Sequence, residues 1–235
     1  MLAKNDSVGK TIIVAFILCL ICSVFVSSAA VFLKPAQSVN EIANMQMNIL
    51  SAAGIYNSKQ PLDDQFKKVT TKLVKLSTGE YDFEVDPSSY NQRKASKDSS
   101  KSRVLNKSED IASIKRQANI AKVYLTHNSD GSIEKIILPI HGYGLWSTLY
   151  GFIAIEGDGN TVSGLGFYEH AETPGLGGEV DNPIWKNQWI GKQIYSEDKV
   201  VIRLIKGGYN MDDHHSIDTL SGASLTSRGV NNMVQ

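Results

Sequence analysis

The 23 residues from Thr11 to Leu33, TIIVAFILCLICSVFVSSAAVFL, contain no charged side chain. A helix needs about 20 mainly apolar residues to cross a bilayer, and buried helices of soluble proteins are usually shorter. A signal peptide cleaved near Ser27–Ala30 is the alternative reading, but its apolar core normally runs for only about 7–15 residues. The length of the run therefore predicts a retained transmembrane helix over residues 11–33.

The lysines around this span bear on its orientation. Lys4 and Lys10 precede the span and Lys34 follows it directly. A short N-terminal segment stays in the cytoplasm, whereas a long following domain is translocated largely regardless of its own charge. We therefore expect residues 1–10 to be cytoplasmic and the main domain to be periplasmic, with one pass through a bacterial inner membrane.

Charge and cysteine content narrow the function classes. The chain has 24 basic and 24 acidic residues, so it lacks the basic excess expected of a nucleic-acid-binding domain. Both cysteines, Cys19 and Cys22, fall inside the apolar span, where small side chains serve helix packing. The rest of the chain therefore has neither a disulfide nor an iron–sulfur ligand set.

Residues 34–119 are expected to form a juxtamembrane region of helices and loops. Pro35 suits the first turn of a helix over residues 34–55, and a second amphipathic segment follows at Leu62–Leu76. The stretch Ser88–Asp110 is rich in serine and lysine, which is typical of a solvated loop or a weak helix.

Residues 120–235 are expected to form the core domain. Short β-rich runs alternate with turn residues, and Gly157–Asn160 is a strong hairpin signal. Asn182–Ile190 begins with an asparagine cap followed by proline, which predicts a short helix, and Val200–Gly208 predicts a strand ending in a glycine turn. These patterns predict an α+β fold, with an antiparallel sheet flanked by helices.

Three glycine-rich segments stand out within this domain: HGYGLW at His141–Trp146, ETPGLGGEV at Glu172–Val180 and SGASLTS at Ser221–Ser227. Each alone is consistent with an ordinary turn. Clustered glycines also let the backbone approach a ligand closely, and Trp146 and Leu176 supply apolar surface beside them. Together the segments favour a site for a flat aromatic ligand.

The segment DTLSGASLT, Asp218–Thr226, lies just before a predicted helix that begins near Leu225. The N–H groups at a helix start favour a phosphate, and the nearby hydroxyls can add hydrogen bonds. A plain helix cap made by Ser224 or Thr226 has the same composition, so the residues alone leave both interpretations open.

Other catalytic and metal sites are not indicated. The chain has no G-x-S-x-G elbow, no P-loop and no G-x-G-x-x-G after a strand. His214 and His215 are adjacent in a polar turn and lack the spacing of a helical metal site. We therefore predict neither a catalytic side chain nor a metal ligand.

The stretches ILPIHGYGLWSTLYGFIAIE, YEHAETPGLGGEVDNP and HSIDTLSGASLTS together resemble the C subunit of the sodium-translocating NADH:quinone oxidoreductase. The resemblance covers nearly the whole chain and is weakest over residues 56–110. Two alternatives remain: the G subunit of the Rnf electron-transport complex, which shares the flavin motif, and a non-redox membrane-anchored binding or assembly module. The family continues beyond the position of Gln235, so the resemblance also predicts a shortened C-terminus.

The resemblance implies an electron-transfer subunit that works with the other subunits of a membrane complex. In the family, a flavin transferase uses FAD to join FMN through its phosphate to the fourth residue of an S-G-A-[T/S]-x-T motif, which is Ser224 here. Threonine is more common at that position, and serine offers the same oxygen with less restriction at χ1. The expected cofactor-binding residues are Ser224, Ser221, Gly222, Ala223, Thr226, Asp218, Trp146, Glu172, Thr173, Leu176, Gly177 and Lys206.

Overall fold

The computed structural model describes residues 7–207, 210 and 212–235, which form two compact units. The first unit runs to Asn44 and the second from Met45 to Gln235. Two sequence expectations, the cytoplasmic Lys4 and the glycine turn at Gly208, lie outside the described residues.

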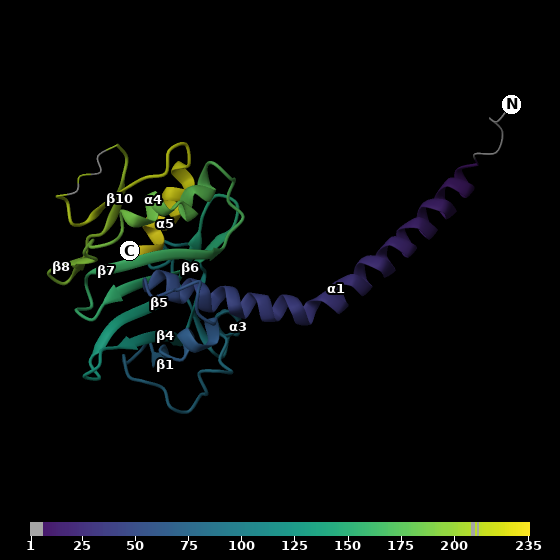
Figure 1. Cartoon of the computed structure of the whole chain (residues 1–235). Coiled ribbons are helices and arrows are strands. Elements are labelled where there is room, and N and C mark those ends of the chain that lie inside the picture. Colours follow the sequence, from purple (N-terminus) through teal and green to yellow (C-terminus); the bar gives the residue numbers. More distant parts are fainter. Residues whose placement is uncertain (1–6, 208–209, 211) are drawn as a thin grey trace. The chain divides into compact units, whose positions relative to one another are not determined.

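Helix α1, Val8–Ala52, provides the apolar span (Figure 1). It is 45 residues long, and its most apolar window has a mean hydropathy of 2.8 with none of its residues buried. A helix with this length and composition is suited to crossing a membrane. The separate helix expected to begin at Pro35 is absent, because α1 continues through this proline. An interior proline removes one helical hydrogen bond and its ring crowds the carbonyl four residues earlier, which disfavours a continuous helix without forbidding it.

The second unit is built on a five-stranded antiparallel sheet with the order β1-β4-β5-β6-β7 (Figure 1). The hairpin predicted at Gly157–Asn160 joins β6 to β7. The α+β architecture predicted from the sequence is confirmed. The five strands are β1 Thr70–Lys75, β4 Ile120–His127, β5 Ile133–Tyr143, β6 Thr148–Glu156 and β7 Val162–Glu169.

Strand β1 shows that the sheet begins earlier in the chain than expected. It lies in the 34–119 region, ahead of the expected core domain, and it pairs with β4 from Thr70↔Leu125 to Lys75↔Ile120. Its sequence TTKLVK buries only Leu73, so the strand carries a weak hydrophobic pattern and gains its place through pairing. The expected boundary at residue 119/120 therefore does not coincide with the edge of the sheet.

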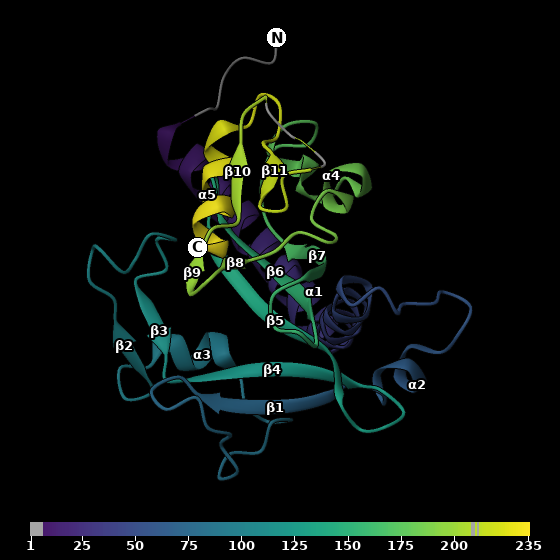
Figure 2. The same ribbon diagram turned by 90° about the vertical axis from the view of Figure 1, so that its left-hand side faces the viewer.

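The sheet carries a hydrophobic core on each face, because neighbouring side chains along a strand point to opposite sides. On β6, Ile153 belongs to a core with Trp185, Trp189 and Val230. Phe152 belongs to a second core that includes Ile49 from the last turns of α1. Figure 2 shows α5 and β10 on the side of the first core.

Short elements complete the second unit. The predicted cap is confirmed, since the Asn182 side chain accepts a hydrogen bond from Ile184 N–H at the start of α4. Strands β10 and β11 pair in parallel, whereas β2 with β3 and β8 with β9 pair antiparallel. The bounds are α2 Leu62–Phe66, α3 Gln92–Lys97, β2 Ser102–Val104, β3 Arg116–Ala118, a 3-10 helix Gly177–Asp181, α4 Pro183–Asn187, β8 Tyr195–Ser196, β9 Lys199–Val200, β10 Arg203–Ile205, β11 Ser216–Asp218 and α5 Ser224–Val234.

Candidate functional site

Helix α5 begins at Ser224, the fourth residue of the SGASLT segment. Ser221, Gly222 and Ser224 are exposed, and Ala223 is buried among the core residues. Among the described residues, none forms a hydrogen bond with the Ser224 hydroxyl. The first turn of a helix also leaves N–H groups without helical partners, so an accessible hydroxyl and free donors meet at this point.

The hydroxyls of this segment do not cap the helix. The N-cap position is Ala223, and no side chain forms a cap hydrogen bond there. Thr226 is fully buried and its hydroxyl donates to the Glu172 carboxylate. Ser227 accepts from Leu220 N–H at 2.9 Å, which fixes the turn before the helix. Ser224 therefore remains exposed without a capping role, which removes the plain-cap interpretation.

Exposed apolar side chains lie on the same loops and helix turn. Trp146 is 64% exposed, Leu176 45% and Leu225 50%. The Trp146 indole donates to the Thr173 hydroxyl at 3.2 Å, so two of the glycine-rich loops touch here. Leu176 lies over the SGAS turn, with its Cδ2 3.0 Å from the point where a Cβ on Gly222 would stand. The arrangement offers a flat ligand an apolar surface beside an exposed hydroxyl.

Glu172 connects all three glycine-rich segments. Its side chain is buried, and Oε1 accepts hydrogen bonds from the N–H groups of Leu145 and Trp146, both at 3.0 Å. Oε2 accepts from the hydroxyl of Thr226. Both carboxylate oxygens are thus engaged inside the protein, and Gly177 packs directly against them.

Asp218 and Lys206 lie at the ends of the paired strands β11 and β10. Asp218 Oδ1 accepts from Gly207 N–H at 3.2 Å, and its carbonyl accepts from the Trp185 indole at 2.8 Å. Lys206 is exposed and follows Ile205, the partner of Asp218 in the strand register. Among the described residues, no hydrogen bond or salt bridge joins this pair to the Trp146 and Glu172 loops. The structure thus brings together ten of the twelve expected residues and leaves these two at the margin.

A cavity of about 290 Å³ borders the Trp146 loop. The guanidinium of Arg93, on α3, makes two hydrogen bonds to Glu169 of 2.7 and 2.8 Å and lies 3.5 Å from the centre of the Tyr150 ring. Arg93 lowers the pKa of Glu169, and burial lowers the pKa of His141, which stacks on Tyr150. The cavity is lined by Arg93, Ser147, Thr148, Tyr150, Glu169, His170 and Ala171.

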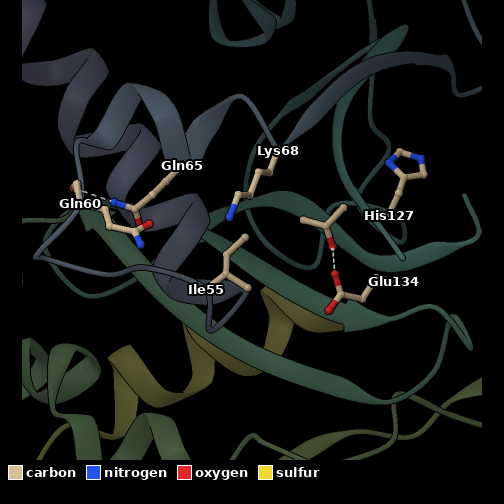
Figure 3. A pocket seen from close by; sticks show the side chains of 7 residues that line it. Ile55, Gln60, Gln65, Lys68, His127 and Glu134 are labelled. Carbon is tan, nitrogen blue, oxygen red and sulfur yellow. Dashed lines mark hydrogen bonds between the residues drawn. The ribbon is translucent and has the colours of Figure 1, made fainter. Parts of the chain in front are cut away.

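A second cavity, of about 420 Å³, lies between the α2 region and the start of β5 (Figure 3). The Thr126 hydroxyl donates to Glu134 across it at 3.2 Å, and Gln65 binds the surrounding backbone through its amide. Lys68 and His127 also line it, and none of the twelve expected cofactor residues does. Its mixed charges and its separation from Ser224 leave it outside the candidate site.

Comparison of the chain with known proteins identifies its family. A family described as "FMN-binding domain" matches residues 144–235. The chain is 45% identical over 234 residues to the C subunit of the Na(+)-translocating NADH-quinone reductase of Yersinia pestis, covering 97% of this chain and 88% of that protein. The protein of the same name from Vibrio alginolyticus is 47% identical over 232 residues, covering 98% and 90%.

The chain belongs to the family of C subunits of the Na(+)-translocating NADH-quinone reductase.

Solved structures agree with this family membership. The crystal structure of Shewanella oneidensis NqrC superposes with a TM-score of 0.77 at 37% identity, covering 83% of this chain and 91% of that one. The structure of the C subunit from Parabacteroides distasonis gives a TM-score of 0.66 at 28% identity, covering 86% and 91%. The resemblance read from the three motif stretches is therefore confirmed, and the apolar helix α1 fits a subunit of a membrane complex.

Sequence reasoning missed several residues that shape the site of this reductase subunit. Leu145 contributes through its backbone N–H, and Ser227 holds the turn before α5. Gln188 accepts from Asp218 N–H at 2.9 Å and so orients the end of β11. None of these roles has a local signal, because each contact joins residues that are distant in sequence or uses the backbone.

Proposed function

We propose that this chain is an electron-transfer subunit that carries FMN through a phosphoester on Ser224. The observation that carries the proposal is the exposed Ser224 hydroxyl, which has no partner among the described residues and stands in the first turn of α5 beside the exposed Trp146 and Leu176. Buried hydrogen bonds of Thr226 and Ser227 support the turn that carries Ser224, and exposed apolar side chains lie beside it, which is unusual for a surface serine.

The match to an FMN-binding family over residues 144–235 supports FMN as the cofactor. Bound FMN supplies one- and two-electron transfer, while the protein sets its position and surroundings. In our proposal the N–H groups of the exposed Ser224 and Leu225, at the start of α5, bind phosphate oxygens. Trp146, Thr173 and Leu176 contact the ring system, and Gly177 lets the loop that bears Thr173 and Leu176 pack against Glu172 and Thr226.

Attachment requires a phosphoryl-transfer step. The Ser224 oxygen forms a bond to the FMN phosphorus of FAD, the anhydride bond to the AMP half breaks, and the serine proton is released as AMP leaves. We assign this step to a separate flavin transferase, as the resemblance to the family implies. Asp218 and the exposed Lys206 lie just outside the motif, where Lys206 can contact the phosphate and Asp218 can orient the loop that carries it.

The membrane arrangement extends the same proposal. We place residues 1–10 in the cytoplasm and 11–33 in the bilayer, with the remaining chain in the periplasm. Residues 120–235 would form the FMN-binding domain, and residues 34–119 would connect it to the membrane while contributing β1. The partners would be the other subunits of the NADH-quinone reductase complex, whose name the relatives carry.

The test is the intact mass of the full-length chain produced with its flavin transferase. We expect an increase equal to one FMN less one water in the wild type, in Ser224→Thr and in Ser196→Ala, which changes an exposed serine outside the motif. Ser224→Ala should lack the increase. An adduct that persists in Ser224→Ala, or a folded wild-type chain that acquires none, would contradict the proposal.

A further inference from the structure

The side chain of Glu172 is buried, with only 5% of its surface exposed, although it belongs to an otherwise exposed loop. Its neighbours Ala171, Thr173 and Leu176 are all exposed. A buried carboxylate is costly unless donors compensate it. The hydrogen-bond donors that compensate the buried Glu172 carboxylate therefore have to come from outside its own loop.

The donors come from two other segments of the chain. Leu145 and Trp146 donate their N–H groups to Oε1, and Thr226 donates its hydroxyl to Oε2. Those residues are 27, 26 and 54 positions away in sequence. One carboxylate thus joins the loop that bears Trp146, the loop that bears Leu176 and the helix turn that bears Ser224.

Two glycines make room for this carboxylate. A Cβ on Gly144 would lie 2.6 Å from Oε1, and a Cβ on Gly177 would lie 2.7 Å from Oε2 and 2.5 Å from the Thr226 hydroxyl. Each distance is below any ordinary non-bonded contact. Gly144 and Gly177 therefore let the backbone of the first two glycine-rich segments close around the Glu172 side chain.

The donors to the Glu172 carboxylate are neutral. Across the described part of the chain, no lysine, arginine or histidine forms a salt bridge with it. Its charge is therefore held close to Trp146 and to the turn of Ser224 without a neutralising cation. A negative charge fixed near a redox group disfavours the addition of an electron to that group.

We propose that Glu172 is a positioning residue rather than a ligand of the cofactor. It locks Trp146 and the Leu176 loop against the first turn of α5 before any flavin arrives, and it places a carboxylate behind the ring-binding surface. The inference rests on the proposed function for its effect on the flavin, but the lock itself exists in the protein without cofactor.

The first experiment measures amide hydrogen exchange in the full-length chain, produced without the flavin transferase. In Glu172→Gln we expect the Leu145 and Trp146 amides to exchange about tenfold faster than in the wild type, since they lose a charged acceptor. The matched control is Glu179→Gln, which removes the same charge from the neighbouring 3-10 helix. Among the described residues, the Glu179 side chain accepts a hydrogen bond only from the Asn182 side chain. Equal exchange in the two variants would overturn the proposal.

Two substitutions at Thr226 test the hydrogen bond between its hydroxyl and Oε2 of Glu172. Thr226→Ser keeps the hydroxyl and should preserve the exchange protection of the Leu176 loop, while Thr226→Val should lose it. If Thr226→Ser and Thr226→Val behave alike, the hydrogen bond to Glu172 does not hold the loop and the proposal is wrong.

The second experiment separates positioning from a merely structural role. In flavin-loaded protein, Glu172→Gln should shift the reduction potential of the flavin to a more positive value, whereas Glu179→Gln should not. Faster exchange with an unchanged potential would make Glu172 structural only and overturn the proposal. A wild type that carries no flavin would instead refute the proposed function, and the exchange measurement would still decide the lock.

Discussion

The loops around Ser224 and the polar segment of residues 86–119 are attached to the same sheet by contacts that differ in their exposure to water. The loops around Ser224 are fixed by buried hydrogen bonds to Glu172 and Ser227. Side-chain turns and the Arg93–Glu169 pair, in which both side chains are more than a third exposed, hold the polar segment at its surface. Part-buried hydrogen bonds from the Tyr90 hydroxyl to the Ile120 carbonyl and from Lys122 N–H to the Gln92 side chain also join it to β4. Water competes for the exposed contacts and is excluded from the buried ones.

This difference shows where the chain needs a defined geometry. In our proposal Ser224 is presented to a modifying enzyme and the site then holds a flat ring, and both steps gain from contacts that do not fluctuate. A segment that covers the end of a sheet can be held by contacts that break and re-form. The carboxylates Glu169 and Glu172, three residues apart, represent the two cases.

The strongest test of the comparison replaces both carboxylates with the same residue. Glu172→Ala leaves the three donors without their acceptor and should cost about 4 kcal/mol of unfolding free energy. Glu169→Ala removes a half-exposed ion pair and should cost less than about 1 kcal/mol. Denaturant unfolding of the full-length chain in detergent measures both, and equal losses would break the distinction.

A glycine substitution tests how tightly the loops around Glu172 are packed. Gly177→Ala forces a methyl group against Glu172 and Thr226 and should cost about 2 kcal/mol, the usual range for overpacking a core. Gly166→Ala is the control, since the nearest atom to its Cβ would be the Asn48 side chain at 3.8 Å. Thermal unfolding of the two variants compares them, and a stable Gly177→Ala protein would show that the loops are looser than we infer.

The smallest expected effect concerns pH. Arg93 lowers the pKa of Glu169 below its ordinary value of 4.5, so the stabilisation from the pair is complete above pH 4.5 and is lost as pH falls through the lowered pKa. Both groups are partly exposed, so the change should stay below about 1 kcal/mol. Arg93→Gln should remove this part of the acid dependence, and unfolding curves from pH 3 to 6 that match the wild type would contradict it.

The sequence predicted the parts of this molecule that have local signals. Asn182 followed by Pro183 marked the start of α4, and the apolar run marked α1. The final helix was expected to begin near Leu225, one residue after its observed start at Ser224. Strand β1 escaped prediction because one buried residue, Leu73, gives too weak a pattern. The start expected at Pro35 was wrong because α1 runs through this proline, and the lost hydrogen bond and the steric crowding that a proline causes are local to one turn of a long helix.

The candidate site was predictable as a set of residues and not as a set of roles. Motif resemblance selected Glu172, Thr226 and Gly177 together. It could not show that Glu172 faces inward, because its partners lie 26 to 54 residues away and two of them are backbone N–H groups. A side chain's direction depends on the packing of all three loops, which no short pattern encodes.

The most direct test of the central claim follows the flavin of this chain inside the assembled membrane complex. NADH is added without quinone and the visible absorbance of the flavin is recorded; quinone is then supplied. We predict that the flavin on Ser224 is bleached by NADH and reoxidised by quinone, and that a complex carrying Ser224→Ala reduces no quinone. A flavin that stays oxidised while the complex turns over would contradict electron transfer through Ser224.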